Sequence, residues 1–327
     1  MSPQDRKAVA TWLFVCAAVS FAVIVVGGLT RLTESGLSIT EWQPLIGAIP
    51  PLSQADWDLL FDKYQATPQS QKVYGMLTME GFKSIFWLEY WHRLLGRLIG
   101  LVFFLPYVFF LVRKRLNKTL ALQLAGIFVL GAMQGVLGWY MVQSGLVNEP
   151  RVSHFRLTAH FGLALLIFSA EFWIALSLLS TENKNKSIFA LLVVGLVFLM
   201  ALSGAMVAGL RAGHAYNTFP LMNGHLVPPE TFLLEPWWRN FLWNVATVQL
   251  LHRSFFWLLL VLIPVLWWRN TNIATHHLLG MFVIQAGLGI GTLLNSVPIG
   301  LASAHQAGAV LLLSAALWTV HTTRRSL

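Results

Sequence analysis

Charged residues are scarce in this sequence. Asp, Glu, Lys and Arg make up 11% of the 327 residues, 56% are hydrophobic, and the mean hydropathy is +0.65. Soluble domains carry about 25% charged residues, so this composition excludes an ordinary soluble domain and indicates an integral membrane protein. The net charge of +9 does not indicate a nucleic-acid partner, because the basic residues fall in short clusters between apolar runs.

Cysteine is almost absent as well. The one cysteine, Cys16, lies inside the first apolar run. A single cysteine can build neither an intrachain disulfide framework nor a cysteine-ligated metal site. Any metal would therefore have to be held by histidine, of which the sequence has ten.

Long apolar runs are abundant. Each is close to the ~20 residues that span the ~30 Å hydrocarbon core of a bilayer. The first run is too long for a cleavable signal peptide and is predicted to be a retained helix. The sequence therefore predicts an all-α integral membrane protein with eight transmembrane helices, at residues 9–29, 84–112, 119–142, 155–179, 187–210, 239–268, 276–294 and 300–321.

The basic clusters between the runs predict the topology, because cytoplasmic loops are enriched in Lys and Arg. Both termini are expected to be cytoplasmic, and the segments 31–83 and 211–238 on the other side are expected to be ordered caps. The short N-terminal segment, which has no Arg/Ser-rich amphipathic stretch, favours a bacterial cytoplasmic (inner) membrane over an organelle. The clusters are Arg6 with Lys7, residues 113–118, Lys184 with Lys186, Arg269, and Arg324 with Arg325.

An internal repeat organises the chain into a first half (1–182) and a second half (183–327). His92-Arg93 recurs as His252-Arg253, an offset of 160 residues. Gln134 with Gly138 recurs as Gln285 with Gly289, an offset of 151, and His160 recurs as His305, an offset of 145. Each half is predicted to be a four-helix bundle, and the two bundles to be pseudo-symmetric and similarly oriented.

Four histidines recur in the second and fourth helix of the two halves: His92, His160, His252 and His305. Two per half is the number needed for bis-histidine ligation of a haem iron. The alternative is that they are core histidines bonded to neighbouring helices, but four in register favour ligands, since such residues are costly in membranes. Of the other six, His154 lies at a helix start without a counterpart in the second half, and an interfacial role is at least as well supported as a site role. His214 and His225 could contact a propionate or be solvated, and no site role is assigned to His276, His277 and His321.

The stretch from Glu89 to Arg97 places ionisable groups at the start of a long apolar helix. Glu89 and His92 share a helix face, and Gly96 leaves that face open for a flat ligand such as a haem. Arg93, Arg97 and, in the second half, Arg253 are candidates to pair with a haem propionate.

The two halves differ three residues before the second-helix histidine, where the first has Glu89 and the second has Gln249. A carboxylate can relay protons or stabilise a cation, whereas an amide can only form hydrogen bonds. This difference assigns the chemistry to the first half and a stable redox cofactor to the second. The alternative for Glu89 is a structural salt bridge to Arg93 or Arg156.

Several long motifs resemble haem A synthase of the proteobacterial and mitochondrial type, and the resemblance runs from the first helix to the last. They are GLTRLTESGLS (28–38), EWQP (41–44), GAIPP (47–51), EYWHR (89–93), HAYNTFPLM (214–222) and SAHQ (303–306). A subgroup of that family carries cysteine pairs in its outer loops. The loops of this chain have none, so a thiol or disulfide step is not expected.

The resemblance implies that the C8 methyl of haem O is oxidised by successive hydroxylations to the formyl group of haem A, for cytochrome c oxidase. It implies that His92 and His160 bracket the substrate haem, and that His252 and His305 ligate a haem b that passes electrons. Glu89 matches the family's important carboxylate. The implied partners are the lipid bilayer, a haem O synthase and an electron donor, whose identity stays open together with the oxygen source and whether the chain is a homo-oligomer.

Two other functions account for part of these features. A bis-histidine b-type electron-transfer cytochrome would use the same four histidines, but it does not require an acid beside one haem only. A transporter would account for the repeat and the intramembrane arginines but would leave the four histidines unexplained.

Overall fold

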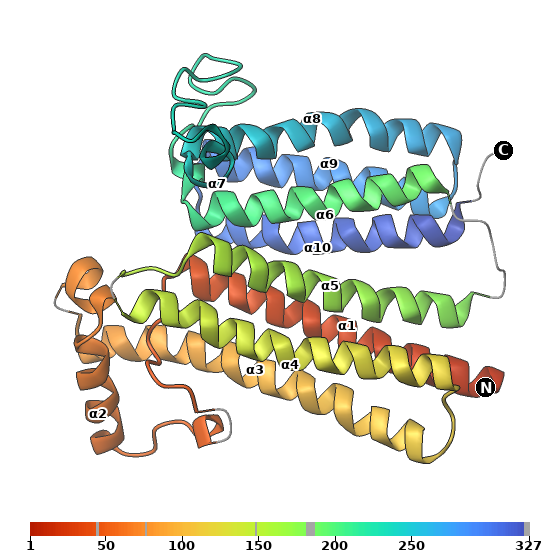
Figure 1. Cartoon of the computed structure of the whole chain (residues 1–327), viewed down its shortest axis with the longest axis horizontal. Coiled ribbons are helices and arrows are strands. Elements are labelled where there is room, and N and C mark those ends of the chain that lie inside the picture. The colour runs from red at the N-terminus through yellow and green to blue at the C-terminus, as the bar shows by residue number, and fades with distance from the viewer. Residues whose placement is uncertain (44–45, 76, 148, 181–186, 324–327) are drawn as a thin grey trace. The chain divides into compact units, whose positions relative to one another are not determined.

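The computed structural model of the chain describes residues 1–43, 46–75, 77–147, 149–180 and 187–323. Within these ranges every regular element is a helix, and eight are long and apolar enough to cross a membrane (Figure 1). The eight are α1 (Pro3–Leu32), α3 (Met79–Val112), α4 (Lys118–Leu146), α5 (His154–Leu179), α6 (Ile188–Gly209), α8 (Val245–Arg269), α9 (Ile273–Leu294) and α10 (Ile299–Thr322). The predicted all-α membrane protein with eight spanning helices is confirmed.

The shorter helices lie in two connecting segments. The first connecting segment (33–78) joins α1 to α3, and the second (210–244) joins α6 to α8. The first connecting segment contains η1 (Ile46–Ala48), α2 (Gln54–Gln65) and η2 (Ser70–Tyr74). The second contains η3 (Ala212–His214), η4 (Trp237–Arg239) and α7 (Asn240–Trp243).

Two helices begin at capping side chains and not at the positions predicted from hydropathy. α3 begins five residues before the predicted position 84, because Thr78 Oγ1 accepts a hydrogen bond from Gly81 N at 3.2 Å. α8 begins six residues after the predicted position 239, where Asn244 Oδ1 accepts from Thr247 N at 3.1 Å. Caps of this kind satisfy the free N–H groups of a first turn, which apolar periodicity does not register.

The first connecting segment packs on α3 through aromatic side chains. Trp57 of α2 lies 4.9 Å from Phe86 of α3 between ring centroids, and Tyr64 lies 5.2 Å from Phe82. These rings belong to one buried cluster. The segment is therefore packed structure, which apolar burial by large rings stabilises.

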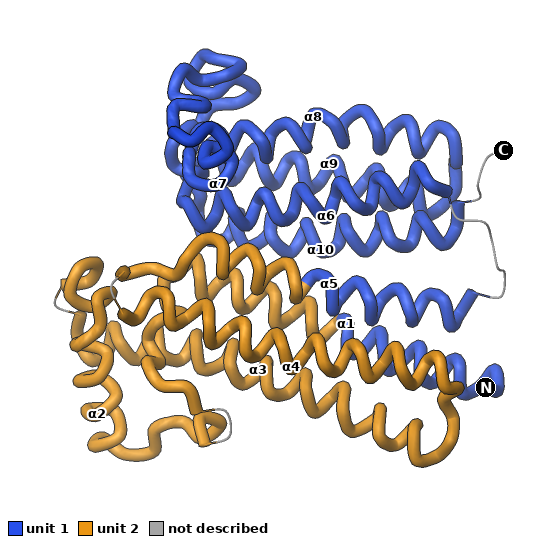
Figure 2. Tube along the Cα trace, viewed as in Figure 1, with its two compact units in different colours: residues 1–17, 165–327 blue, residues 18–164 orange. Residues whose placement is uncertain are grey.

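The described chain divides into two compact units (Figure 2). One comprises residues 18–164, here the 18–164 unit, and the other comprises residues 1–17 and 165–327, here the 165–327 unit. In the first, α3 contacts α4, and in the second α6, α8, α9 and α10 contact one another. The predicted division of the chain near residue 182, and the basic residues Lys184, Lys186, Arg324 and Arg325, lie outside the described residues.

Candidate functional site

Glu89 is a buried carboxylate with four hydrogen bonds. Glu89 is 2% exposed. Oε2 accepts from Ser38 Oγ at 2.7 Å and from Ile39 N at 2.9 Å, and Oε1 accepts from Arg93 Nε at 2.9 Å and Nη2 at 2.6 Å. The acid thus ties α3 to the first connecting segment, and the salt bridge to Arg93 weighed from the sequence is present.

Arg93 also binds the first connecting segment. Besides Glu89, its Nη2 donates to Ile39 O at 2.7 Å and its Nη1 donates to Glu41 O at 3.0 Å. One turn further along α3, Arg97 Nη2 donates to Gln43 O at 2.9 Å. In this structure both guanidinium groups hold the connecting segment, and pairing of Arg93 with a propionate stays a prediction.

The corresponding residues of α8 hold the second connecting segment. Arg253 Nη2 donates to Tyr216 O at 3.0 Å, and Nη1 lies 3.3 Å from the carbonyl oxygens of Pro220 and Leu221. Gln249 Nε2 donates to Tyr216 O at 3.3 Å. Gln249 therefore binds α8 to the second connecting segment, as Glu89 binds α3 to the first, but without a charge.

The four candidate histidines share one packing feature: each ring lies against a glycine of the spanning helix that precedes its own in the chain. A Cβ added to that glycine would lie 2.7 to 3.2 Å from the nearest ring atom, closer than ordinary van der Waals contact. Gly96, by contrast, faces open space, as the sequence predicted for a free helix face. The pairs are Gly27–His92, Gly138–His160, Gly204–His252 and Gly289–His305.

The structure brings the histidines together in the expected pairs. His92 and His160, both in the 18–164 unit, are close enough to interact electrostatically, and so are His252 and His305 in the 165–327 unit. The backbone carbonyls of His160 and His305 each accept a hydrogen bond at 2.9 Å from a glutamine of the preceding helix, Gln134 and Gln285 respectively.

The donor set fits a haem iron. Among the described residues there is no group of three His, Cys, Asp or Glu side chains that could hold a metal ion by itself. A pair of neutral imidazoles suits a porphyrin, which supplies the remaining four nitrogen ligands. Ser203 Oγ lies 2.8 Å from His252 Nδ1 and also donates to Met200 O at 2.7 Å. His252 Nδ1 must then carry the proton, which leaves Nε2 as the free electron pair for a metal.

The remaining histidines make local contacts. Nδ1 of His276 and of His277 lies 2.7 Å from the carbonyl oxygen four residues earlier, and His225 pairs with Met222 in an isolated bridge. The ring of His321 lies 4.2 Å from that of Trp173.

Sequence reasoning missed three polar side chains. Ser203 sits in α6 beside His252, Tyr140 sits in α4 beside Arg156, and Glu171 is 1% exposed within α5. Only Glu171 carried a clear signal, since an acid inside an apolar run marks a functional candidate by default. Ser203 and Tyr140 can be assigned to a site only when it is known that they face His252 and Arg156, respectively.

Comparison with known proteins identifies the family. Residues 10–317 match the family model described as cytochrome oxidase assembly protein, COX15-CtaA. A protein of Nitrosospira multiformis named heme A synthase is 55% identical, over 98% of this chain and 94% of its own length. One of Nitrosomonas eutropha with the same name is 54% identical, over 96% and 93%. The heme A synthase COX15 of Arabidopsis thaliana is 42% identical, over 99% and 76%. The chain therefore belongs to the COX15-CtaA family of cytochrome oxidase assembly proteins.

Proposed function

We propose that this chain is a haem A synthase, a membrane-bound oxidoreductase that converts the C8 methyl group of haem O into the formyl group of haem A by successive hydroxylations. The observation that carries the proposal is an asymmetry between two histidine pairs. Both pairs pack on glycines in the same manner, but only His92 has a carboxylate, Glu89, three residues before it, where His252 has Gln249. The names of the relatives support the same function.

His252 and His305 are the proposed ligands of a resident haem b. The hydrogen bond at His252 Nδ1 and the glycine contacts orient their rings, and such surrounding contacts tune metal ligands. A resident haem would supply one-electron transfer.

His92 and His160 are the proposed residues that bracket the substrate haem. Among the described residues, no side chain bonds to the ring of His92 as Ser203 does to His252, and Nε2 of His92 faces Gly27. A ring held by packing alone suits a ligand that must admit and release a substrate. Glu89, beside it, is the proposed anionic group of the reaction, as a proton relay or as a stabiliser of positive charge.

The proposed reaction takes place in the bilayer. The chain is a multi-pass membrane protein by the length and composition of its helices. We place it in the bacterial inner membrane with both termini in the cytoplasm, where it would take haem O from a haem O synthase and electrons from a donor.

The test is to purify the full chain from membranes that contain haem O, extract its non-covalent haems and identify them by mass. We expect haem b together with haem O, a hydroxylated intermediate or haem A. Haem b alone, at two per chain, would refute the synthase and would instead identify an electron-transfer cytochrome.

A further inference from the structure

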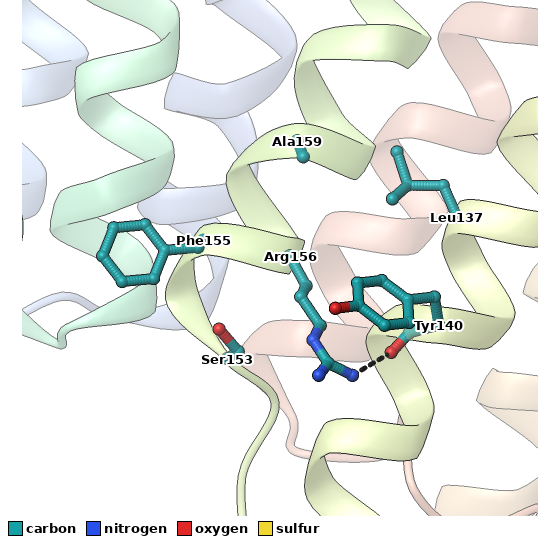
Figure 3. Close-up of a pocket in the computed structure, with 6 residues that line it drawn as sticks. All are labelled: Leu137, Tyr140, Ser153, Phe155, Arg156 and Ala159. Atoms are coloured by element: carbon teal, nitrogen blue, oxygen red, sulfur yellow. Dashed lines mark hydrogen bonds between the residues drawn. The ribbon is translucent and has the colours of Figure 1, made fainter.

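A cavity opens between α4 and α5 in the 18–164 unit (Figure 3). Its volume is about 370 Å³. Ligand sites span about 300–1,000 Å³, so this cavity suits one part of a ligand better than a whole porphyrin. The lining residues are Leu137, Tyr140, Ser153, Phe155, Arg156 and Ala159.

Arg156 is the charged group of this cavity. Its guanidinium lies 3.6 Å from the ring centroid of Tyr140, and Nη1 donates to Tyr140 O at 2.7 Å. Within the described parts of the chain no carboxylate forms an ion pair with it. Stacking on the ring and the bond to the carbonyl fix the guanidinium plane. The group is thus an oriented positive charge with donors to spare.

The cavity lies next to a proposed haem ligand. Arg156 precedes His160 by four residues in α5, so the two side chains share a helix face and are separated by about 6 Å along the axis. Ala159, beside His160, lines the same cavity. A flat ligand at His160 would extend one edge toward Arg156.

In the second half, the two corresponding positions carry residues without charge or aromatic ring. The offsets that relate the histidines, 151 for α4 and 145 for α5, take Tyr140 to Gly291 and Arg156 to Leu301. There, Leu301 Cδ1 lies 3.8 Å from where a Cβ on Gly291 would stand. The same two positions therefore meet in both halves, as a cation on an aromatic ring in one and as an apolar contact in the other.

We infer that Arg156, positioned by Tyr140, binds a carboxylate of the substrate porphyrin, a propionate of haem O, in the first half only. This inference rests on the proposed function and deepens it. Arg93 is paired with Glu89 and bonded to two backbone carbonyls, whereas Arg156 donates to one carbonyl and lies one turn from His160, so Arg156 is better placed than Arg93 to take the anionic edge. Ser153, which also lines the cavity, adds a hydroxyl.

The test is an optical titration of the full chain, loaded with its resident haem, in phosphatidylcholine nanodiscs. Haem O and its propionate dimethyl ester are the two probes. The variants are Arg156→Leu, which installs the residue of the second half, Arg156→Lys, and the control Arg151→Leu, an exposed arginine outside the cavity. We expect Arg156→Leu to weaken haem O binding about tenfold or more, as for a lost bond to a charged group.

Arg156→Lys should recover part of the affinity, Arg151→Leu should bind as the wild type does, and the ester should bind the wild type and Arg156→Leu alike. Equal haem O affinity in Arg156→Leu and wild type would overturn the inference, as would equal losses for haem O and ester, which indicate a structural role. A haem O affinity that falls on adding phosphatidylglycerol, and no longer does so in Arg156→Leu, would reassign the site to a lipid phosphate. Failure of the wild type to bind haem O would refute the proposed function itself.

Discussion

Replacing Gly289 with alanine would push a methyl group into the ring of His305. The new Cβ would lie 2.7 Å from Cε1, and ordinary contact begins at 3.4 Å, so the ring would have to move by about 0.7 Å. Overpacking of this kind costs about 1–3 kcal/mol. Since 1.4 kcal/mol is tenfold in affinity, we expect haem at His305 to bind about 5- to 150-fold more weakly.

The same helix offers a matched control. Gly287 lies two residues earlier in α9 and has nothing within 4 Å of an added Cβ, so Gly287→Ala should leave haem binding unchanged and stabilise the helix by about 0.5–1 kcal/mol. The assay is the transfer of haem from each purified variant to excess apomyoglobin, with the haem-to-protein ratio measured beforehand. Equal retention of haem by Gly289→Ala and Gly287→Ala would show that the glycine contact does not position His305.

Three further predictions concern other parts of the chain. Glu89→Gln should stall oxidation while the haem of the second half is retained, because the amide keeps some hydrogen bonds but not the charge; undiminished haem A in extracts would contradict the role of Glu89. Ser203→Ala should remove a bond worth about 1 kcal/mol from His252 and shift the midpoint potential of the resident haem, and Ser203→Thr should restore it; an unchanged potential in Ser203→Ala would refute the tautomer argument. The Ser53 hydroxyl and backbone N–H groups lower the pKa of Asp56. The Asp56 carboxylate therefore stabilises the start of α2 fully above the unfolded pKa of about 3.9, and this stabilisation is lost as the pH falls through the lower folded pKa. Hydrogen exchange of α2 should show this loss in the wild type and not in Asp56→Asn.

The helices were predictable because each apolar run is long enough to cross a bilayer, and that signal survives without any tertiary information. Their ends were not, since Thr78 and Asn244 set the starts of α3 and α8 by capping. The pairing of histidines was also predictable, because the internal repeat relates His92 to His252 and His160 to His305.

The partners of these residues could not be derived from the sequence. Glu89 is bonded to Ser38 and Ile39, about fifty residues earlier in the chain, and no local periodicity links such positions. Arg156 was weighed as a partner of Glu89, whereas it lies on Tyr140. Choosing between two acceptors requires knowledge of which helix face meets which, and that is a property of packing.

The salt bridge between Glu89 and Arg93 also bears on how α3 enters the membrane. The two residues are four apart on one helix, so each charge can be neutralised by the other as soon as the helix forms, before the first connecting segment has docked. An isolated charge at the centre of a spanning helix costs about 2.5–3.5 kcal/mol on insertion scales. Arg253 in α8 has no acid in that position, since Gln249 replaces it. We therefore expect α3 to insert with its charge already paired, whereas the charge of α8 is satisfied only when the carbonyl groups of Tyr216, Pro220 and Leu221 have reached Arg253.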